Sequence, residues 1–195
     1  MADATKIACA IAAITAGAVL GSAVVWLPAS LGYKPWVVSG SSMRDTLYSD
    51  DLAYSRPGAT PKTEDIVIAT APAAWGLDRE DLVKRVVAEP GDTVTIDSTG
   101  RLHAGGDADS PLVDSREKQW SSECPSMLGD ADGETITLGR DEWLLRGDNV
   151  NNSSDSRWAW CRGESPVVET SQIKAVVEHV VPVGKALSKI IPTGD

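Results

Sequence analysis

The 195-residue chain contains no phenylalanine, only two histidines and only three cysteines. Without phenylalanine, its seven tryptophans and its aliphatic residues must supply the large apolar contacts of a core. The histidines, His103 and His179, offer few candidates for a base that would activate a serine nucleophile. No Cys-x-x-Cys pair and no His/Cys cluster occurs, so we expect neither a metal ion nor another cofactor.

Positive charge is also scarce: 18 Lys and Arg face 28 Asp and Glu, for a net charge of −10. With no basic stripe to neutralise phosphates, we expect no nucleic-acid partner. Electrostatic recruitment to anionic lipid is disfavoured for the same reason. Hydrophobic residues make up 42% of the chain, enough for a packed core. The length suits one domain, with or without an inserted lobe, plus an anchor.

A long apolar run lies near the N-terminus, where residues 7–31 carry no charge. A membrane-spanning helix needs about 20 such residues, so we predict a transmembrane anchor over 7–31, after a short tail at 1–6. A cleaved signal peptide is the alternative, but its apolar core has about 7–15 residues and a more positive start than Lys6 provides. Aromatic residues fall where the outer membrane interface would lie: Trp26, Tyr33 and Trp36.

After the anchor, short apolar segments alternate with Gly/Pro/Asp-rich turns, which predicts strands rather than helices. We find no amphipathic helix of ordinary length outside the anchor. The pattern therefore predicts a mainly β body over 35–99 and 140–185, with a C-terminal tail at 186–195. The expected strands are 36–38, 51–54, 65–70, 81–87, 93–96, 135–138, 142–146, 166–169 and 174–183.

Residues 100–139 differ from the rest, because they contain a Gly-Gly pair, several acids and no sustained periodicity. We interpret them as a small inserted lobe with some local order, since a structureless loop of this length is unusual in a compact domain. Cys124 lies in this lobe and Cys161 in the body. The two could form a disulfide in an oxidising compartment or remain free thiols, because sequence does not give the distance between them.

Ser42 and Lys84 form the candidate catalytic pair. Ser42 lies in a Ser/Gly-rich segment at 39–47, where a turn without catalytic meaning is the plain alternative. In the strand predicted around Lys84, Leu82 and Val86 share its face through the two-residue period. A lysine on an apolar inward face loses hydration, which lowers its pKa towards values suited to a general base. An edge lysine whose amine reaches water is the alternative.

A third segment, RGDNVNNSSDSRW at 146–158, carries too many hydrogen-bonding side chains for a simple exposed turn. Asp148, Asn149, Asp155 and Arg157 could form a satisfied polar network that supports a site from behind. A solvated Asn/Ser loop is the alternative.

The order of these segments behind an anchor resembles that of type I signal peptidases, membrane-bound serine–lysine enzymes. In that family, Ser-Met-x-Pro-Thr-Leu carries the nucleophile, and the segment here is SMRDTL at 42–47. Lys-Arg-Val followed by Pro-Gly-Asp carries the base, matched by KRVVAEPGD at 84–92. The Gly-Asp-Asn box ending in Ser-x-Asp-Ser-Arg matches GDN at 147–149 and SSDSR at 153–157. The resemblance covers most of the chain.

The resemblance implies a signal-peptidase-like β catalytic body and a role for each matching residue. Ser42 attacks the scissile carbonyl and Lys84 takes its proton. Ser153 orients the lysine amine. The Ser42 main-chain N–H is one oxyanion donor, and Gly40 offers a second from its backbone only. The remaining implied roles are supporting or substrate-binding: Asp148, an ion pair between Asp155 and Arg157, and Met43 as a candidate substrate contact.

Three positions depart from the family pattern: Asp45 replaces the usual proline, Ala88 a common glycine, and Val150 a frequent arginine. None removes a reacting group, so we expect a signal-peptide-removing endopeptidase that cleaves exported precursors after small residues, as in Ala-x-Ala. The implied location is the plasma membrane, with a single span in the lipid bilayer and an extracytoplasmic catalytic domain. The alternatives are a maturation protease dedicated to few substrates and a non-catalytic membrane-tethered β binding module.

Overall fold

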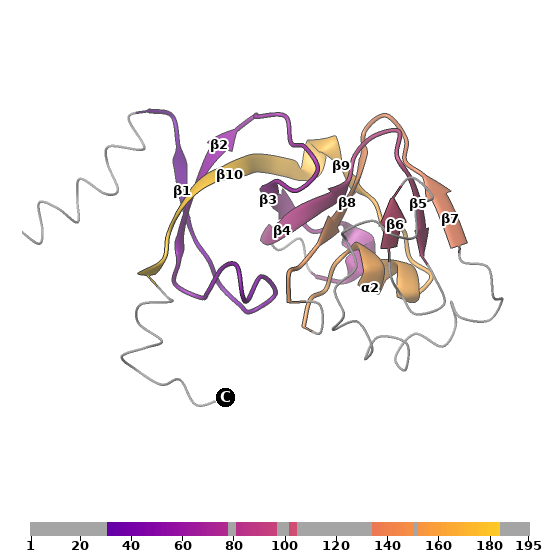
Figure 1. Cartoon of the computed structure of the whole chain (residues 1–195), viewed down its shortest axis with the longest axis horizontal. Helices are drawn as coiled ribbons and strands as arrows, with labels where there is room; N and C mark the ends of the chain where they lie inside the picture. Colours follow the sequence, from indigo (N-terminus) through magenta and orange to yellow (C-terminus); the bar gives the residue numbers. More distant parts are fainter. Residues whose placement is uncertain (1–30, 78–80, 97–101, 105–133, 150–151, 184–195) are drawn as a thin grey trace, which may run out of the picture.

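Antiparallel strands form two sheets in the computed structural model, which describes residues 31–77, 81–96, 102–104, 134–149 and 152–183 (Figure 1). The larger sheet has seven strands in the order β1-β2-β10-β3-β4-β8-β9. Its strands are β1 (Lys34–Val37), β2 (Leu52–Pro57), β3 (Ile66–Thr70), β4 (Asp81–Ala88), β8 (Glu142–Arg146), β9 (Val168–Glu169) and β10 (Ile173–Val181).

The long strand β10 joins the two halves of this sheet by pairing with β2 along one edge and β3 along the other. β-branched residues fill much of β3 and β10, as expected for strands, and β3 is the more deeply buried of the two. The register of β10 shifts between Val177 and His179 and again between Ile173 and Ala175. Such bulges increase local twist, and β10 curves visibly between the two halves (Figure 1).

The smaller sheet has three strands in the order β6-β5-β7, at the opposite end of the molecule from β1 (Figure 1). They are β5 (Thr93–Ile96), β6 (Leu102–Ala104) and β7 (Glu134–Thr137). The predicted boundaries place β5 in the catalytic body, whereas its partners here both come from the segment predicted as a lobe. Lobe residues 105–133 lie outside the described residues, so the lobe and domain boundaries stay predictions.

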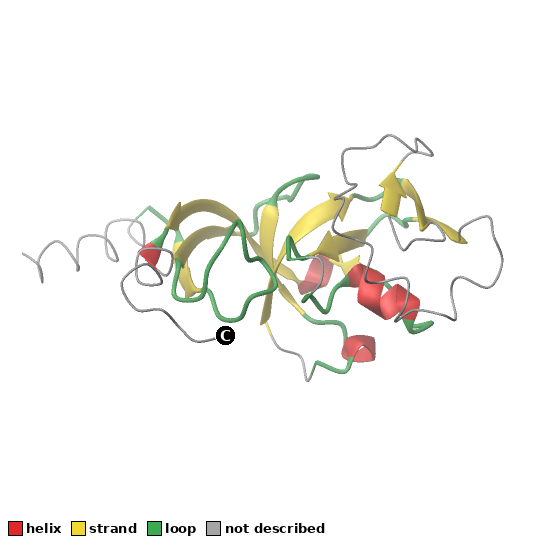
Figure 2. Ribbon diagram, turned by 60° about the horizontal axis from the view of Figure 1, so that its bottom comes forward, coloured by secondary structure: helices red, strands yellow, loops and turns green. Residues whose placement is uncertain are grey.

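Helices are few and short among the described residues (Figure 2). They are η1 (Ala73–Trp75), α2 (Ser156–Cys161) and η3 (Thr170–Gln172). The mainly β class predicted from sequence is confirmed, and the described strands fall within a few residues of the expected ones. β6 was missed because three residues carry too little periodicity.

Two other predictions fall largely outside the described part of the chain. No helix among the described residues is long and apolar enough to span a membrane. The predicted anchor falls on residues 7–31, of which 7–30 are not described. Cys124 and the side chain of Cys161 are likewise not described, so the possible disulfide stays a prediction.

Candidate active site

Ser42 lies in the segment between β1 and β2, which is closed on itself by main-chain hydrogen bonds. Val38 N donates to Asp51 O at 2.9 Å, and Asp50 N donates back to Val38 O at 2.9 Å. Met43 and Leu47 hold the segment against the core, because both side chains are buried in one hydrophobic cluster with Val38 and Ala53. The nucleophile candidate is therefore held on an ordered loop with a hydrophobic base.

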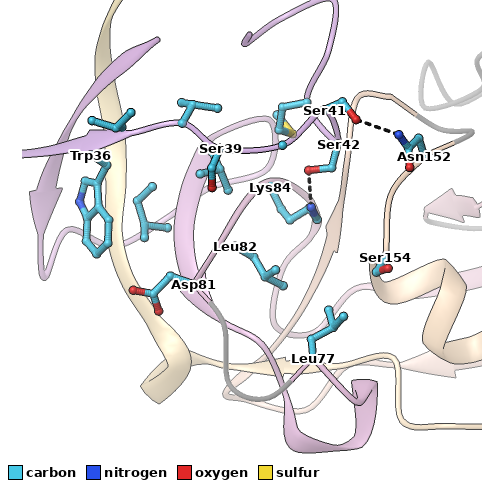
Figure 3. A pocket seen from close by; sticks show the side chains of 16 residues that line it. Trp36, Ser39, Ser41, Ser42, Leu77, Asp81, Leu82, Lys84, Asn152 and Ser154 are labelled. Carbon is cyan, nitrogen blue, oxygen red and sulfur yellow. Dashed lines mark hydrogen bonds between the residues drawn. The ribbon is translucent and has the colours of Figure 1, made fainter. Parts of the chain in front are cut away.

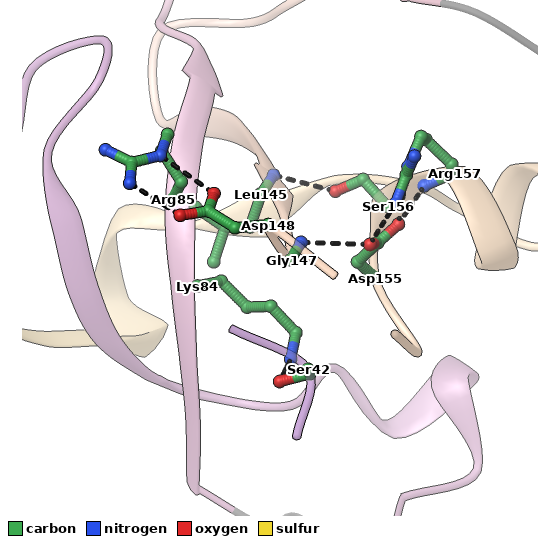
Figure 4. A network of polar contacts seen from close by, with 9 residues as sticks. All are labelled: Ser42, Lys84, Arg85, Leu145, Gly147, Asp148, Asp155, Ser156 and Arg157. Atoms are coloured by element: carbon green, nitrogen blue, oxygen red, sulfur yellow. Dashed lines mark hydrogen bonds and ion pairs between the residues drawn. The ribbon is translucent and has the colours of Figure 1, made fainter. Parts of the chain in front are cut away.

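Lys84 lies in the middle of β4, opposite Val67 of β3, and is only 3% exposed. Its Nζ atom is 2.6 Å from Ser42 Oγ, so one hydrogen bond joins the two predicted catalytic residues (Figures 3 and 4). They come from different elements, 42 positions apart in the sequence. The fold thus brings together the pair that the sequence could only suggest.

Burial lowers the pKa of the Lys84 amine, because the charged form loses hydration in the protein interior. The positive charge of Arg157 lowers this pKa further, whereas Asp155 and Asp148 act in the opposite direction. The net shift is downward from the ordinary value of 10.5. A neutral lysine amine in contact with a serine hydroxyl has the geometry and proton affinity of a general base.

The Gly-Asp-Asn box lies next to the nucleophile segment and holds its main chain. Asn149 donates twice, from its N–H to Ser42 O at 2.9 Å and from Nδ2 to Ser41 O at 2.9 Å. Asn152 Nδ2 donates to Ser41 Oγ at 2.8 Å. The two bonds from Asn149 fix the main chain of Ser42 relative to the end of β8, whereas the bond from Asn152 orients only the Ser41 side chain.

Asp155 and Arg157 form the ion pair that the resemblance implied. Arg157 Nη2 lies 2.8 Å from Asp155 Oδ2, and both side chains are almost fully buried. Asp155 also caps α2 and accepts a hydrogen bond from Gly147 N at 3.0 Å (Figure 4). Burial alone would raise the pKa of the Asp155 carboxyl, but Arg157 and these hydrogen bonds keep it below its usual value. A charged, satisfied pair therefore lies behind Lys84.

Asp148 connects the strand that carries the lysine to the loop that carries the serine. Arg85 binds it with two hydrogen bonds, Nε to Oδ1 at 2.9 Å and Nη2 to Oδ2 at 2.6 Å (Figure 4). Thr46 Oγ1 donates to the same carboxylate. Burial works to raise the pKa of Asp148, but these donors hold it below its ordinary value. The side chain next to Lys84 in sequence thus helps to hold the loop that contains Ser42.

Ser153 lies at the back of the site and is 8% exposed. Its Oγ makes no hydrogen bond with the Lys84 amine. It packs closely against Gly147, where an added Cβ would lie 2.2 Å from Ser153 Oγ. The predicted role of Ser153 in orienting Lys84 stays a prediction.

The nucleophile segment contains two residues with positive φ, Gly40 at 83° and Asp45 at 84°. Among the described residues, the N–H groups of Gly40 and Ser42 donate no main-chain hydrogen bond, and their oxyanion role stays a prediction. Proline has φ near −65° and cannot adopt the Asp45 conformation. The family's usual proline is therefore incompatible with this turn as it is built here.

A cavity of about 490 Å³ opens beside Ser42 and Lys84 (Figure 3). It runs between residues 36–43 and 81–84, with Met43 in its lining. β1 is an edge strand, and β8 pairs with β4 only from Arg85 onwards. Each side of the cavity therefore offers main-chain groups that no described strand uses. Met43 is itself 2% exposed and packs into the core, so its predicted substrate contact stays a prediction.

Several residues of the site were not singled out from the sequence. Ser41, Thr46 and Asn152 belong to ordinary polar turns, and only the fold shows what they contact. Gly147 belongs to the matched Gly-Asp-Asn box, but the sequence does not predict its close approach to Ser42. No group of three or more His, Cys, Asp or Glu residues that could hold a metal ion occurs in the described ranges.

The family model described as signal peptidase, peptidase S26, matches residues 9–182, and the chain belongs to this family. Signal peptidase I P of Bacillus subtilis subsp. natto is 25% identical over 138 residues, which cover 69% of this chain and 71% of the relative. Signal peptidase I S of Bacillus subtilis (strain 168) is 28% identical over 129 residues, 64% of this chain and 66% of the relative.

These matches span about two thirds of the length of both curated relatives. A crystal structure of a signal peptidase I from Enterococcus faecalis V583 aligns with 62% of this chain and 98% of its own, at 20% identity and a TM-score of 0.38.

Proposed function

We propose that this chain is a membrane-anchored serine endopeptidase that removes signal peptides from exported precursors, with Ser42 as nucleophile and Lys84 as base. The observation that carries the proposal is the 2.6 Å hydrogen bond between Lys84 Nζ and Ser42 Oγ, made by a lysine that is 3% exposed. Membership of the signal peptidase family supports the same reaction.

The reaction begins with neutral Lys84, which takes the proton of Ser42 as Oγ attacks the scissile carbonyl carbon. The oxyanion that forms accepts hydrogen bonds from the main-chain N–H groups of Ser42 and Gly40. Lys84 then gives its proton to the departing amine, the C–N bond breaks, and an ester joins Ser42 to the upstream peptide. A water molecule, deprotonated by Lys84, hydrolyses this ester and restores the serine.

An extended peptide fits the cavity as an added strand between β1 and the first half of β4. Its main chain would bond to the unused groups on both sides, while alternate side chains enter the cavity. Trp36, Ile68 and Leu82 line this region, which favours apolar over charged side chains near the scissile bond. Preference for small residues such as Ala-x-Ala, and attachment to the membrane through 7–31, complete the proposal.

The test uses the full-length chain in detergent with a peptide that contains one Ala-x-Ala site, and mass spectrometry locates the cut. We expect cleavage after the second alanine by the parent chain and none by Ser42→Ala or Lys84→Met. Lys62→Met is the matched control, because Lys62 is exposed and does not line the cavity. Cleavage by Lys84→Met at the parental rate would refute the dyad.

If the parent chain does not cleave the Ala-x-Ala peptide but cleaves one native precursor, the result would favour a maturation protease dedicated to few substrates. Absence of cleavage on every exported precursor, with a folded protein, would leave only the non-catalytic binding module.

A further inference from the structure

The two ends of the cavity differ in chemistry on either side of Ser42. Between β1 and β4, the lining includes the apolar side chains of Trp36, Ile68 and Leu82, with Ser39 and Asp81 as polar members. Beyond Ser42, the lining is polar and consists of Asn152 and Ser154 (Figure 3). Both come from the segment that leads into α2, not from the strands that border the other end.

Asn152 is held in a defined orientation. Its main-chain N–H donates to Asn149 O at 3.0 Å, and its side-chain Nδ2 donates to Ser41 Oγ at 2.8 Å. The first bond fixes the main chain of Asn152, and the second orients its side-chain amide. An asparagine amide carries an acceptor as well as donors. Its Oδ1 accepts no hydrogen bond from the described residues, although the side chain borders the cavity.

We propose that Asn152 and Ser154 form a subsite for the peptide segment that follows the scissile bond. Asn152 Oδ1 accepts a hydrogen bond from a main-chain N–H of that segment. The inference rests on the proposed function. In that function, the peptide upstream of the scissile bond occupies the cavity between β1 and β4, which leaves the Asn152 and Ser154 end for the peptide downstream of the bond. A main-chain contact of this kind tolerates any side chain, which suits an enzyme whose products begin with different residues.

The test compares two substrates with the same upstream peptide. One continues for four residues beyond the cut, and the other is a methyl ester with no residue there. Asn152→Ala should lower kcat/KM on the long peptide by about three- to tenfold, the effect of losing one neutral hydrogen bond. It should leave the ester within twofold of the parent. Asn152→Asp should recover most of the loss, because a carboxylate keeps the acceptor and the Ser41 hydroxyl can rotate to donate.

The kcat/KM on the long peptide divided by that on the ester measures the contribution of the subsite. Ser154→Ala should reduce this ratio by a smaller factor than Asn152→Ala does. An equal loss on both substrates by Asn152→Ala would assign the residue to support of the nucleophile segment and overturn the subsite. An unchanged kcat/KM on the long peptide would overturn it too. A parent chain that cleaves neither substrate would instead refute the proposed function, so the two failures are distinguishable.

Discussion

Replacement of Gly147 by alanine should abolish most of the activity while adding only one methyl group. Gly147 is buried at the end of β8, between the nucleophile segment and Ser153. An added Cβ would lie 2.5 Å from Ser42 O, 2.6 Å from Ser153 Cβ and 2.2 Å from Ser153 Oγ. The serine hydroxyl can rotate away, but Ser42 O belongs to the main chain and moves only with its loop.

The size of the effect follows from these distances. Ordinary van der Waals contact begins at 3.4 Å, so the backbones of Gly147 and Ser42 must separate by roughly 1 Å. That displacement stretches the 2.9 Å hydrogen bond from Asn149 N to Ser42 O and shifts Oγ relative to the Lys84 amine. A misplacement of this size costs on the order of 100-fold in rate, and overpacking costs about 1–3 kcal/mol of stability.

The assay measures kcat/KM on the Ala-x-Ala peptide beside the melting temperature of the same preparation. Gly139→Ala is the matched control, because its added Cβ meets only the flexible end of the Glu142 side chain, at 3.1 Å. The control should keep near-parental activity. The packing argument would be refuted by a Gly147→Ala chain that has the melting temperature of the parent and a kcat/KM within threefold of the parental value.

Three further predictions concern the lysine and the loop. The kcat/KM of the parent should rise with pH through a Lys84 pKa below 10.5, because only the neutral amine accepts the serine proton; a pH profile without such an acid limb would contradict this. Lys84→Met should melt higher than the parent at neutral pH, and the gap should close as pH rises towards 10.5. Between the lowered Lys84 pKa of the folded chain and the ordinary value of 10.5, the unfolded chain binds more of the lysine proton than the folded chain, so the parent gains stability with pH. Equal melting temperatures of the two chains at neutral pH would count against a desolvated Lys84 amine. Asp45→Pro should lower the free energy of unfolding in urea by more than about 1 kcal/mol, whereas Asp45→Gly should leave it unchanged, because only glycine adopts a φ of 84° without strain. Equal stability of the two variants would refute a left-handed turn at this position.

Strand positions were largely predictable, because the alternation of apolar residues and the Gly/Pro turns depend on neighbours in sequence. β4 illustrates this: its expected range of 81–87 differs from the observed Asp81–Ala88 by one residue. Pairing was not predictable in the same way. β5 was assigned to the main body, and only the fold shows that it pairs with β6 and β7.

Some residues of the candidate site could likewise be predicted from the sequence, whereas the contacts of others could not. Ser42, Lys84, Asp155 and Arg157 could be named from motifs, because the chemistry of nucleophile, base and ion pair requires particular residue types. The contacts of Thr46 and Asn152 could not, because a hydroxyl or an amide in a polar turn has many possible partners. Their partners lie about 100 positions away in sequence.

The sequence by itself determined the mainly β class, the residue types of the site and the order of its three segments. The tertiary structure decided whether the serine and the lysine meet, how deeply the amine is buried, and that Gly147 leaves room for the nucleophile segment. The reason is physical: strand propensity and motif chemistry are local, whereas desolvation and hydrogen-bond distance depend on segments that only the folded sheet brings together.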